Sequence, residues 1–229
     1  MDERLQTVMK ELAGLGSPEN RAGMARYGIN VADAFGVSIP ALRAIGKRLG
    51  TDHALAQALW ETGKHEARIL AALVDDPAQV SDEQMEAWVS DFDSWDLCDQ
   101  VCSNLFDRTF SAHAKAAEWA GRDEEFVKRA GFALMAALSV HDKTADEEAF
   151  LVFLPIIERE AGDDRPLVKK AVNWALRQIG KRDRALNRAA VTTAERVRAQ
   201  RTRSARWIAN DALRELLSDK VQKRLASRS

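Results

Sequence analysis

The stretch "SWDLCD", residues 94–99, brings together two residue types that favour positive charge. Asp99 follows Trp95 by four residues, which on an α-helix places it one turn along and about 40° around the axis. An indole face attracts a cation through its quadrupole, and a carboxylate attracts one through its charge. The pair is therefore suited to a reaction in which a cation develops. Asp96 falls at about 100° on the same wheel and is predicted to point outward, away from Trp95.

The helices that carry these residues must set their position relative to the core. In the helix that begins at Trp95, the apolar residues cover one arc, and Trp95 and Asp99 lie at its border with solvent. A second helix, 167–179, puts Trp174 at the same kind of border, beside Lys170. A border Trp can rest on the core and still present a ring face outside it.

Structural interpretations of the same residues remain open. Border tryptophans commonly serve packing alone. Arg129 lies in an almost wholly apolar helix, 126–138, and its guanidinium must find an anion, either a protein carboxylate or a bound group. Asp99 could cap its helix or pair with Arg129 instead of acting on a ligand.

The chain as a whole has the pattern of a helical repeat array. Period-2 alternation is absent, and apolar residues recur at helical spacing in roughly a dozen segments. Similar small-residue-rich helices recur about every 30–45 residues, anchored at Arg68, Asp99, Arg129, Lys170 and Trp207. We therefore predict an all-α fold, an α-α superhelix of HEAT-like repeats whose inner helices line a concave groove. No Pro/Gly/Ser-rich linker interrupts it, so residues 1–229 are predicted to form a single domain.

The composition limits the class of protein. No run reaches the roughly 20 apolar residues of a membrane span, and the N-terminus has no apolar signal core, so we expect a cytoplasmic protein without membrane contact. We also expect a monomer. Cys98 and Cys102 lie four apart on one helix face and are predicted to be reduced core residues. The four histidines lack metal-ligand spacing, and nucleotide-binding glycine motifs are absent. We therefore expect neither a metal nor a cofactor.

Charge is unevenly distributed along the chain. The net charge is −1, yet residues 161–229 carry 18 Lys/Arg against 7 Asp/Glu, while 1–160 carry 16 against 28. A basic end of this kind is typical of a protein that meets a polyanion. The alternative is that the charges of each part are only hydrated by solvent and bind no partner.

The quoted motifs also resemble a known family. "MARYGINVADAFGVSIPALRAI" (24–45), "SWDLCD" (94–99), "FVKRAGFAL" (126–134) and "VKKAVNWALRQIGKR" (168–182) are similar, in this order, to the AlkD-like DNA alkylation repair glycosylases. These are HEAT-like repeat proteins, and the similarity covers nearly the whole chain. The sequence departs at Ser94, where a family member has a second Trp.

The resemblance implies an activity and a set of site residues. The activity is that of a monofunctional glycosylase that hydrolyses the N-glycosidic bond of cationic N3- or N7-alkylated purines in duplex DNA. It acts without base flipping, for which a shallow cleft is suitable. The implied catalytic residues are Asp99, Trp95 and Trp174. The expected DNA-binding residues are Arg129, Tyr27, Lys170, Arg177, Lys181 and Arg182.

Two other functions remain as alternatives. One is a catalytically silent HEAT-like module that binds damaged or branched DNA, and the joint presence of Trp95, Asp99 and Trp174 argues against it. The other is a protein-binding scaffold, a common use of α-solenoids, which the basic C-terminal third disfavours.

Overall fold

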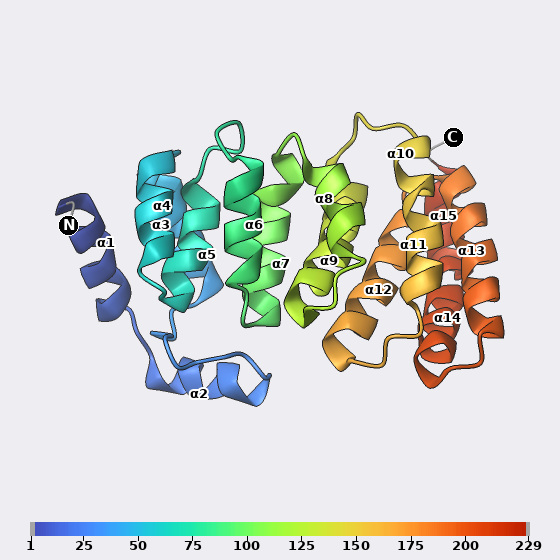
Figure 1. The fold of residues 1–229 in the computed structure, drawn as a ribbon, viewed down its shortest axis with the longest axis horizontal. Coiled ribbons are helices and arrows are strands. Elements are labelled where there is room, and N and C mark those ends of the chain that lie inside the picture. Colours follow the sequence, from blue (N-terminus) through green and yellow to red (C-terminus); the bar gives the residue numbers. More distant parts are fainter. Residues whose placement is uncertain (1–2, 228–229) are drawn as a thin grey trace. The chain divides into compact units, whose positions relative to one another are not determined.

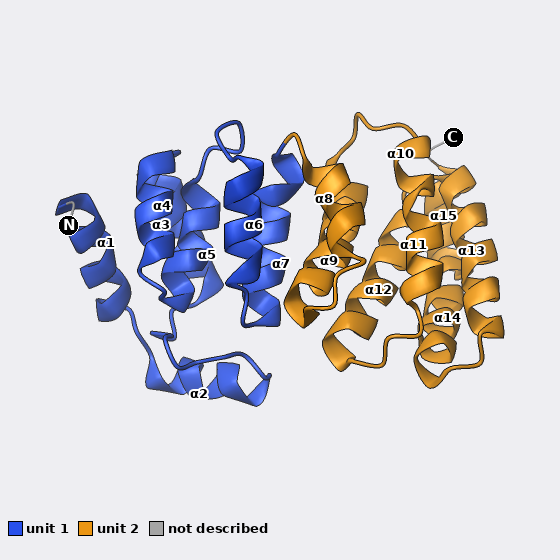
Figure 2. Ribbon diagram, in the orientation of Figure 1, with its two compact units in different colours: residues 1–109 blue, residues 110–229 orange. Residues whose placement is uncertain are grey.

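The structure, a computed structural model, describes residues 3–227 and is helical throughout (Figure 1). Those residues form fifteen α-helices and one short 3₁₀ helix, with no strand among them. The prediction of an all-α chain is therefore confirmed. The chain divides into two compact units, Met1–Thr109 and Phe110–Ser229 (Figure 2). The prediction of a single domain stays a prediction.

Unit 1 is a stack of helices in which α3 packs on α5, and α5 packs on α7. Helix α5 packs against α3, α4 and α7, so it lies at the centre of the stack. The helices are α1 (Glu3–Gly14), α2 (Pro18–Arg26), α3 (Ile39–Leu49), α4 (His53–Glu61), α5 (His65–Val74), α6 (Asp82–Ser90) and α7 (Trp95–Asn104), followed by the 3₁₀ helix η1 (Phe106–Arg108). Helix α2 differs from the others because it buries none of its side chains.

Unit 2 repeats the arrangement. Helix α9 pairs with α8 and packs on α12, and α12 in turn packs on α14, which pairs with α13. The helices are α8 (Ala112–Trp119), α9 (Glu125–His141), α10 (Glu148–Leu151), α11 (Phe153–Glu160), α12 (Pro166–Ile179), α13 (Arg184–Ala199), α14 (Arg203–Leu216) and α15 (Asp219–Ala226).

Local sequence signals explain where many helices begin. Side chains of Asp52, Ser81 and Thr202 each accept a backbone N–H from three residues ahead, at the starts of α4, α6 and α14. Such N-caps satisfy amides that have no partner in the first turn. Pro18 and Pro166 occupy the first turns of α2 and α12, where the missing N–H costs nothing.

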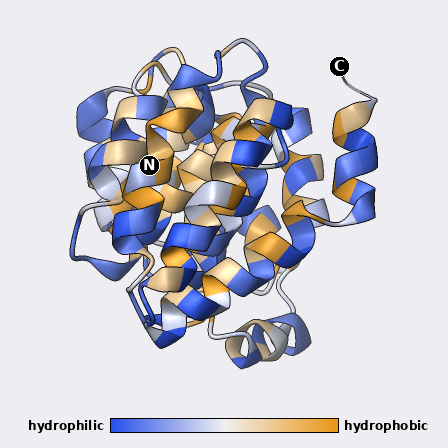
Figure 3. Cartoon of the chain, turned by 90° about the vertical axis from the view of Figure 1, so that its right-hand side faces the viewer, coloured by the Kyte–Doolittle hydropathy of each residue, from blue (hydrophilic) through white to orange (hydrophobic). Residues whose placement is uncertain are grey.

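The buried faces form an aromatic and aliphatic core in each unit. In unit 1 the rings of Trp60 and Trp88 stack with centroids 3.9 Å apart. In unit 2 His113 stacks on Phe153 at 5.8 Å. Most helices show hydrophobic and hydrophilic residues in alternating bands, as amphipathic helices do (Figure 3). Cys98 and Cys102 are free and fully buried in unit 1, as predicted.

Candidate active site

The start of α7 is hydrogen-bonded to the segment that follows α2. The indole N–H of Trp95 donates to the carbonyl oxygen of Tyr27 at 3.0 Å. The Asn30 side chain donates to Asp93 at 2.6 Å. These contacts hold the residues after α2 against the N-terminus of α7, so two segments far apart in sequence border the same space.

That space is a pocket of about 710 Å³ within unit 1. Three predicted site residues line it: Trp95 and Asp99, both half-buried, and Tyr27, which is 77% exposed. The remaining lining residues come from α2, α3, α5 and α7 and the linker between α2 and α3. They are Glu19, Asn20, Gly23, Met24, Arg26, Ile29, Val37, Ser38, Ile39, His65, Glu66, Ile69, Asp96 and Gln100. Helix α2 and its linker form one wall of this pocket, and the shallow cleft that the family resemblance implies stays a prediction.

The outward direction predicted for Asp96 is wrong. Its side chain is only 15% exposed and lines the same pocket as Asp99. One carboxylate oxygen lies 2.9 Å from Nε2 of the buried His65. The other is buried without a hydrogen-bond partner among the described residues. The wheel failed because it describes α7 alone, whereas α5 packs alongside and covers the flank on which Asp96 lies.

His65 and Glu66, at the N-terminus of α5, were not selected from the sequence. The Glu66 carboxylate accepts the backbone N–H groups of Phe35, Gly36 and Val37 at 2.8, 2.6 and 3.1 Å. It therefore shapes the linker that forms the pocket wall. The signal that could have identified the pair is "HE" at the start of an otherwise apolar helix, since buried ionisable groups need partners.

The pKa of His65 lies above its usual value. Burial on its own lowers this pKa, but the hydrogen bond to Asp96 and the charges of Asp96, Glu66 and Asp93 raise it by more. The protonated imidazole is thus held among carboxylates at the pocket wall. Its stabilising contribution is complete below the unfolded-state pKa of about 6.5 and is lost as the pH rises through the raised folded-state pKa.

We expect His65→Gln to reduce the free energy of unfolding most at acidic pH. The difference from the wild type should shrink as the pH rises from below about 6.5 through the raised folded-state pKa, because the wild-type imidazolium then loses its proton. Urea denaturation across this range measures it. The same comparison for His141→Gln, a change at an exposed histidine, controls for the loss of one imidazole as such. A His65→Gln difference that stays constant with pH would contradict the charged interaction.

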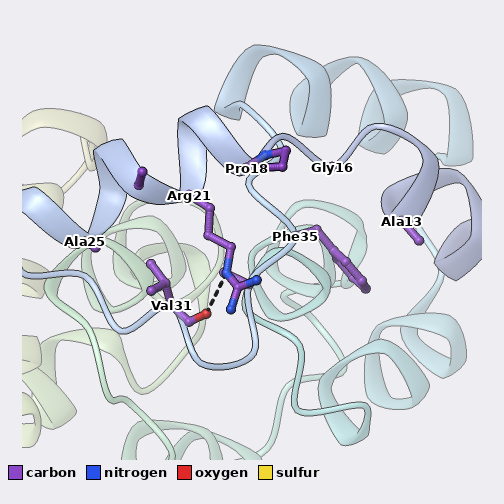
Figure 4. A pocket seen from close by; sticks show the side chains of 9 residues that line it. Ala13, Gly16, Pro18, Arg21, Ala25, Val31 and Phe35 are labelled. Atoms are coloured by element: carbon purple, nitrogen blue, oxygen red, sulfur yellow. Dashed lines mark hydrogen bonds between the residues drawn. The ribbon is translucent and has the colours of Figure 1, made fainter.

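A second pocket of unit 1, about 540 Å³, has a different character. It lies between α1, α2 and the linker and is lined mainly by small apolar residues, with Pro18 and Phe35 at its edges (Figure 4). Its one ionisable lining residue, Arg21, donates to the Val31 carbonyl at 3.1 Å. Without an acid–base pair in its lining, this pocket is a poor candidate for catalysis.

Unit 2 contains the other predicted residues. Trp174 is half-buried on α12, and Lys170, one turn earlier, is exposed. Arg129 is buried on α9, and its guanidinium donates to the Leu167 carbonyl at 2.6 Å. The sequence indicated that the Arg129 guanidinium needs an acceptor. A backbone carbonyl oxygen at the start of α12 is one of its acceptors. Whether Arg129 and Trp174 form one cleft with Trp95 and Asp99 stays a prediction.

Three of the cations expected to hold phosphates are engaged inside unit 2. Arg177 pairs with Glu215, and it also contacts Asp211 at 3.2 Å. Lys181 contacts Glu215 at 2.8 Å. Burial alone would raise the pKa of Glu215, but the hydrogen bonds from Arg177 and Lys181 outweigh burial and lower it.

Arg182 is likewise engaged by its own unit. Its guanidinium donates to the carbonyl oxygens of Ser139, Asp142 and Ala145, and it lies 4.2 Å from the ring centroid of Phe150. Arg177, Lys181 and Arg182 thus have partners within unit 2, and their expected contact with DNA phosphates stays a prediction. Lys170 is the exposed cation of the predicted set.

The part of the chain that the structure describes has neither a cluster of metal-ligating side chains nor a membrane-spanning helix. Within residues 3–227, no three His, Cys, Asp or Glu side chains gather as a metal site would require. No helix in that range is both long and apolar enough to span a membrane.

Comparison with known proteins now places the chain. Residues 8–216 match the family model described as "DNA alkylation repair enzyme". The chain belongs to the DNA alkylation repair enzyme family. A search of curated proteins gives no match. A solved structure described as "a new family of proteins related to the HEAT-like repeat DNA glycosylases with affinity for branched DNA structures" superposes with a TM-score of 0.76. It is 23% identical, over 95% of this chain and 96% of that one.

The likeness shows that this DNA alkylation repair protein has the HEAT-like repeat fold, as the repeat spacing predicted. Ser94, the departure noted in the family motif, has a structural role of its own. It is fully buried, and its hydroxyl accepts the backbone N–H of Asn30 at 2.9 Å. An indole could neither accept this bond nor fit the space, so Ser94 belongs with the linker that walls the pocket in this family member.

Proposed function

We propose that the protein is a monofunctional DNA glycosylase for cationic N3- or N7-alkylated purines in duplex DNA. The observation that carries the proposal is that Trp95, Asp99 and Tyr27 line one pocket of unit 1. An indole and a carboxylate at one opening are the groups that favour a developing cation. Family membership supports a role in alkylation repair.

The chemistry follows from the lesion and from these residues. An alkylated purine already carries positive charge, so it leaves without being protonated, and the sugar becomes oxocarbenium-like. Asp99 stabilises that cation through its charge and orients or deprotonates the attacking water. Trp95 presents its ring beside the cation. No lysine forms a Schiff base, so borohydride should trap no enzyme–DNA adduct.

The proposal extends to unit 2 and to the setting of the reaction. Arg129 and Trp174 also act on the damaged nucleotide, and Lys170 contacts a phosphate. The half-buried positions of Trp95 and Asp99 support attack on the sugar from outside the duplex, without flipping of the base. We further propose that the protein works as a cytoplasmic monomer.

Release of free 7-methylguanine and 3-methyladenine from methylated duplex DNA tests the activity. The proposal requires release above the spontaneous rate, with abasic sites formed in equal amount. A second candidate function is favoured by the relative with affinity for branched DNA: binding of branched or damaged DNA without cleavage. Tight binding to a branched substrate with no base release would support this second function and exclude the first.

A further inference from the structure

Helix α14 presents an exposed stripe that combines cations with a large aromatic ring. Its other side is buried in unit 2, so the stripe is the face that remains open to solvent. Trp207 is 41% exposed, unlike the fully buried Trp119 of the same unit. The residues of this stripe, which we call the α14 stripe, are Arg203, Arg206, Trp207, Asn210 and Arg214.

The α14 stripe repeats a pattern of α12, the helix on which α14 packs. Trp174 follows Lys170 by four residues on α12, and Trp207 follows Arg203 by four on α14. Each tryptophan thus has a cation one helical turn before it. The two helices themselves align at a shift of 37 residues, because their ends and buried positions coincide at that shift, so Trp207 occupies the position at which α12 has the exposed Lys170.

The surroundings of Trp207 are positively charged. Lys169 of α12 places its ammonium 5.1 Å from the ring centroid. The acid at the edge of the stripe, Asp211, is already occupied, since it accepts from Asn173 at 2.7 Å and pairs with Arg177 and Arg214. Arg214 is thus neutralised by Asp211, whereas Arg203 and Arg206 are the exposed cations of the stripe that remain for an anionic ligand.

The turn before α14 adds another cation. Arg201 is exposed and has φ 64°, in the left-handed region. A non-glycine residue there costs about 1–2 kcal/mol, so glycine would be the favoured residue if only the turn mattered. The sequence has an arginine at this position, which adds a positive charge to the turn before α14.

An exposed indole within a basic surface fits one ligand chemistry. Proteins that bind single strands of DNA combine cations that track the backbone with aromatic rings on which bases stack. Within a duplex both faces of each base are covered by neighbouring bases, so an indole can stack only on a base that has lost a neighbour. An acidic polypeptide would satisfy the cations but would offer no base to stack on the ring.

We propose that the α14 stripe binds an unpaired DNA strand, with a nucleobase stacked on Trp207 and the flanking phosphates held by Arg203 and Arg206. Such strands occur at overhangs, gaps and branch points. The inference rests on the DNA-binding part of the proposed function and not on base excision.

Fluorescence anisotropy with two labelled DNAs tests the proposal: a blunt duplex, and the same duplex with a short single-stranded overhang. The wild type should bind the overhang DNA about fivefold or more tightly, because one stacked base contributes at least that factor. In Trp207→Ala this ratio should fall to about one, and Trp207→Phe should retain most of it. Phe110→Ala, which removes another highly exposed aromatic of unit 2, should keep the wild-type ratio.

The outcomes separate this proposal from the proposed function. If the wild type binds blunt duplex but shows no preference for the overhang, only the proposal for the α14 stripe is overturned. The same holds if the preference survives in Trp207→Ala or disappears in Phe110→Ala. Absence of binding to either DNA overturns both proposals. Competition supplies a further arm: oligo(dT) should displace the overhang DNA far better than poly-glutamate at equal charge. Equal displacement would assign the stripe to an acidic polypeptide and overturn the proposal.

Discussion

Asp99→Asn should lower the single-turnover rate of 7-methylguanine release by on the order of 10²-fold or more, while leaving folding and binding to undamaged duplex nearly intact. Asparagine keeps the size and most of the hydrogen-bonding capacity of aspartate, so the loss reports the negative charge. The negative charge stabilises the transition state more than the bound substrate, because the sugar becomes cationic only as the transition state is approached.

The controls for Asp99→Asn follow from the structure. Asp96→Asn is unsuitable, because it would remove the partner of His65 in the same pocket. Glu61→Gln is a better control, because Glu61 is exposed at the end of α4 and lies outside the pocket lining. Full activity in Asp99→Asn, or an equal loss in Glu61→Gln, would return Asp99 to a structural role.

The two tryptophans should matter less than Asp99. A cation–π contact contributes about 0.5–2 kcal/mol, which corresponds to roughly 2- to 30-fold in rate. Trp95→Ala and Trp174→Ala are therefore each expected to lose less activity than Asp99→Asn under the same single-turnover conditions. A loss in either tryptophan variant larger than that of Asp99→Asn would show that the rings position the DNA rather than only stabilise charge.

Affinity for duplex DNA should fall steeply with salt. Each phosphate neutralised by a Lys or Arg contributes about −0.9 to the log–log slope, so four such contacts would weaken binding about 10²-fold between 50 and 200 mM salt. Anisotropy titrations at several salt concentrations measure the slope. Affinity that is independent of salt over this range would refute a phosphate-binding surface in the basic third.

Lys170→Gln isolates one such contact and should make the slope less steep by about 0.9. Arg177 and Lys181 are less informative targets, because neutralising them would leave the partly buried Glu215 without its partners. Lys10→Gln removes an exposed charge from α1, outside the basic third, and should leave the slope unchanged. Equal effects of the two variants would indicate net charge rather than a phosphate contact.

The local rules predicted more about the helices than about their side-chain partners. The border positions of Trp95 and Asp99 agree with the structure, because each depends on residues within one or two turns. The engagement of Lys181 by Glu215, 34 residues away, was not predictable, because it depends on how α14 lies against α12. The charge count identified a basic third and could not tell which cations are already paired.

By itself, the sequence determined the all-helical repeat fold, the buried cysteines and the position of Trp95 and Asp99 together at the border of one helix. The helical period and the repeat spacing act along one chain segment at a time, so they can be read without knowing what packs on it. Only the tertiary structure decided that Asp96 faces the pocket with His65, and that the linker after α2 forms its wall. The reason is physical: a buried carboxylate or imidazole takes the partner that packing brings within about 3 Å, and packing depends on all the helices of a unit together.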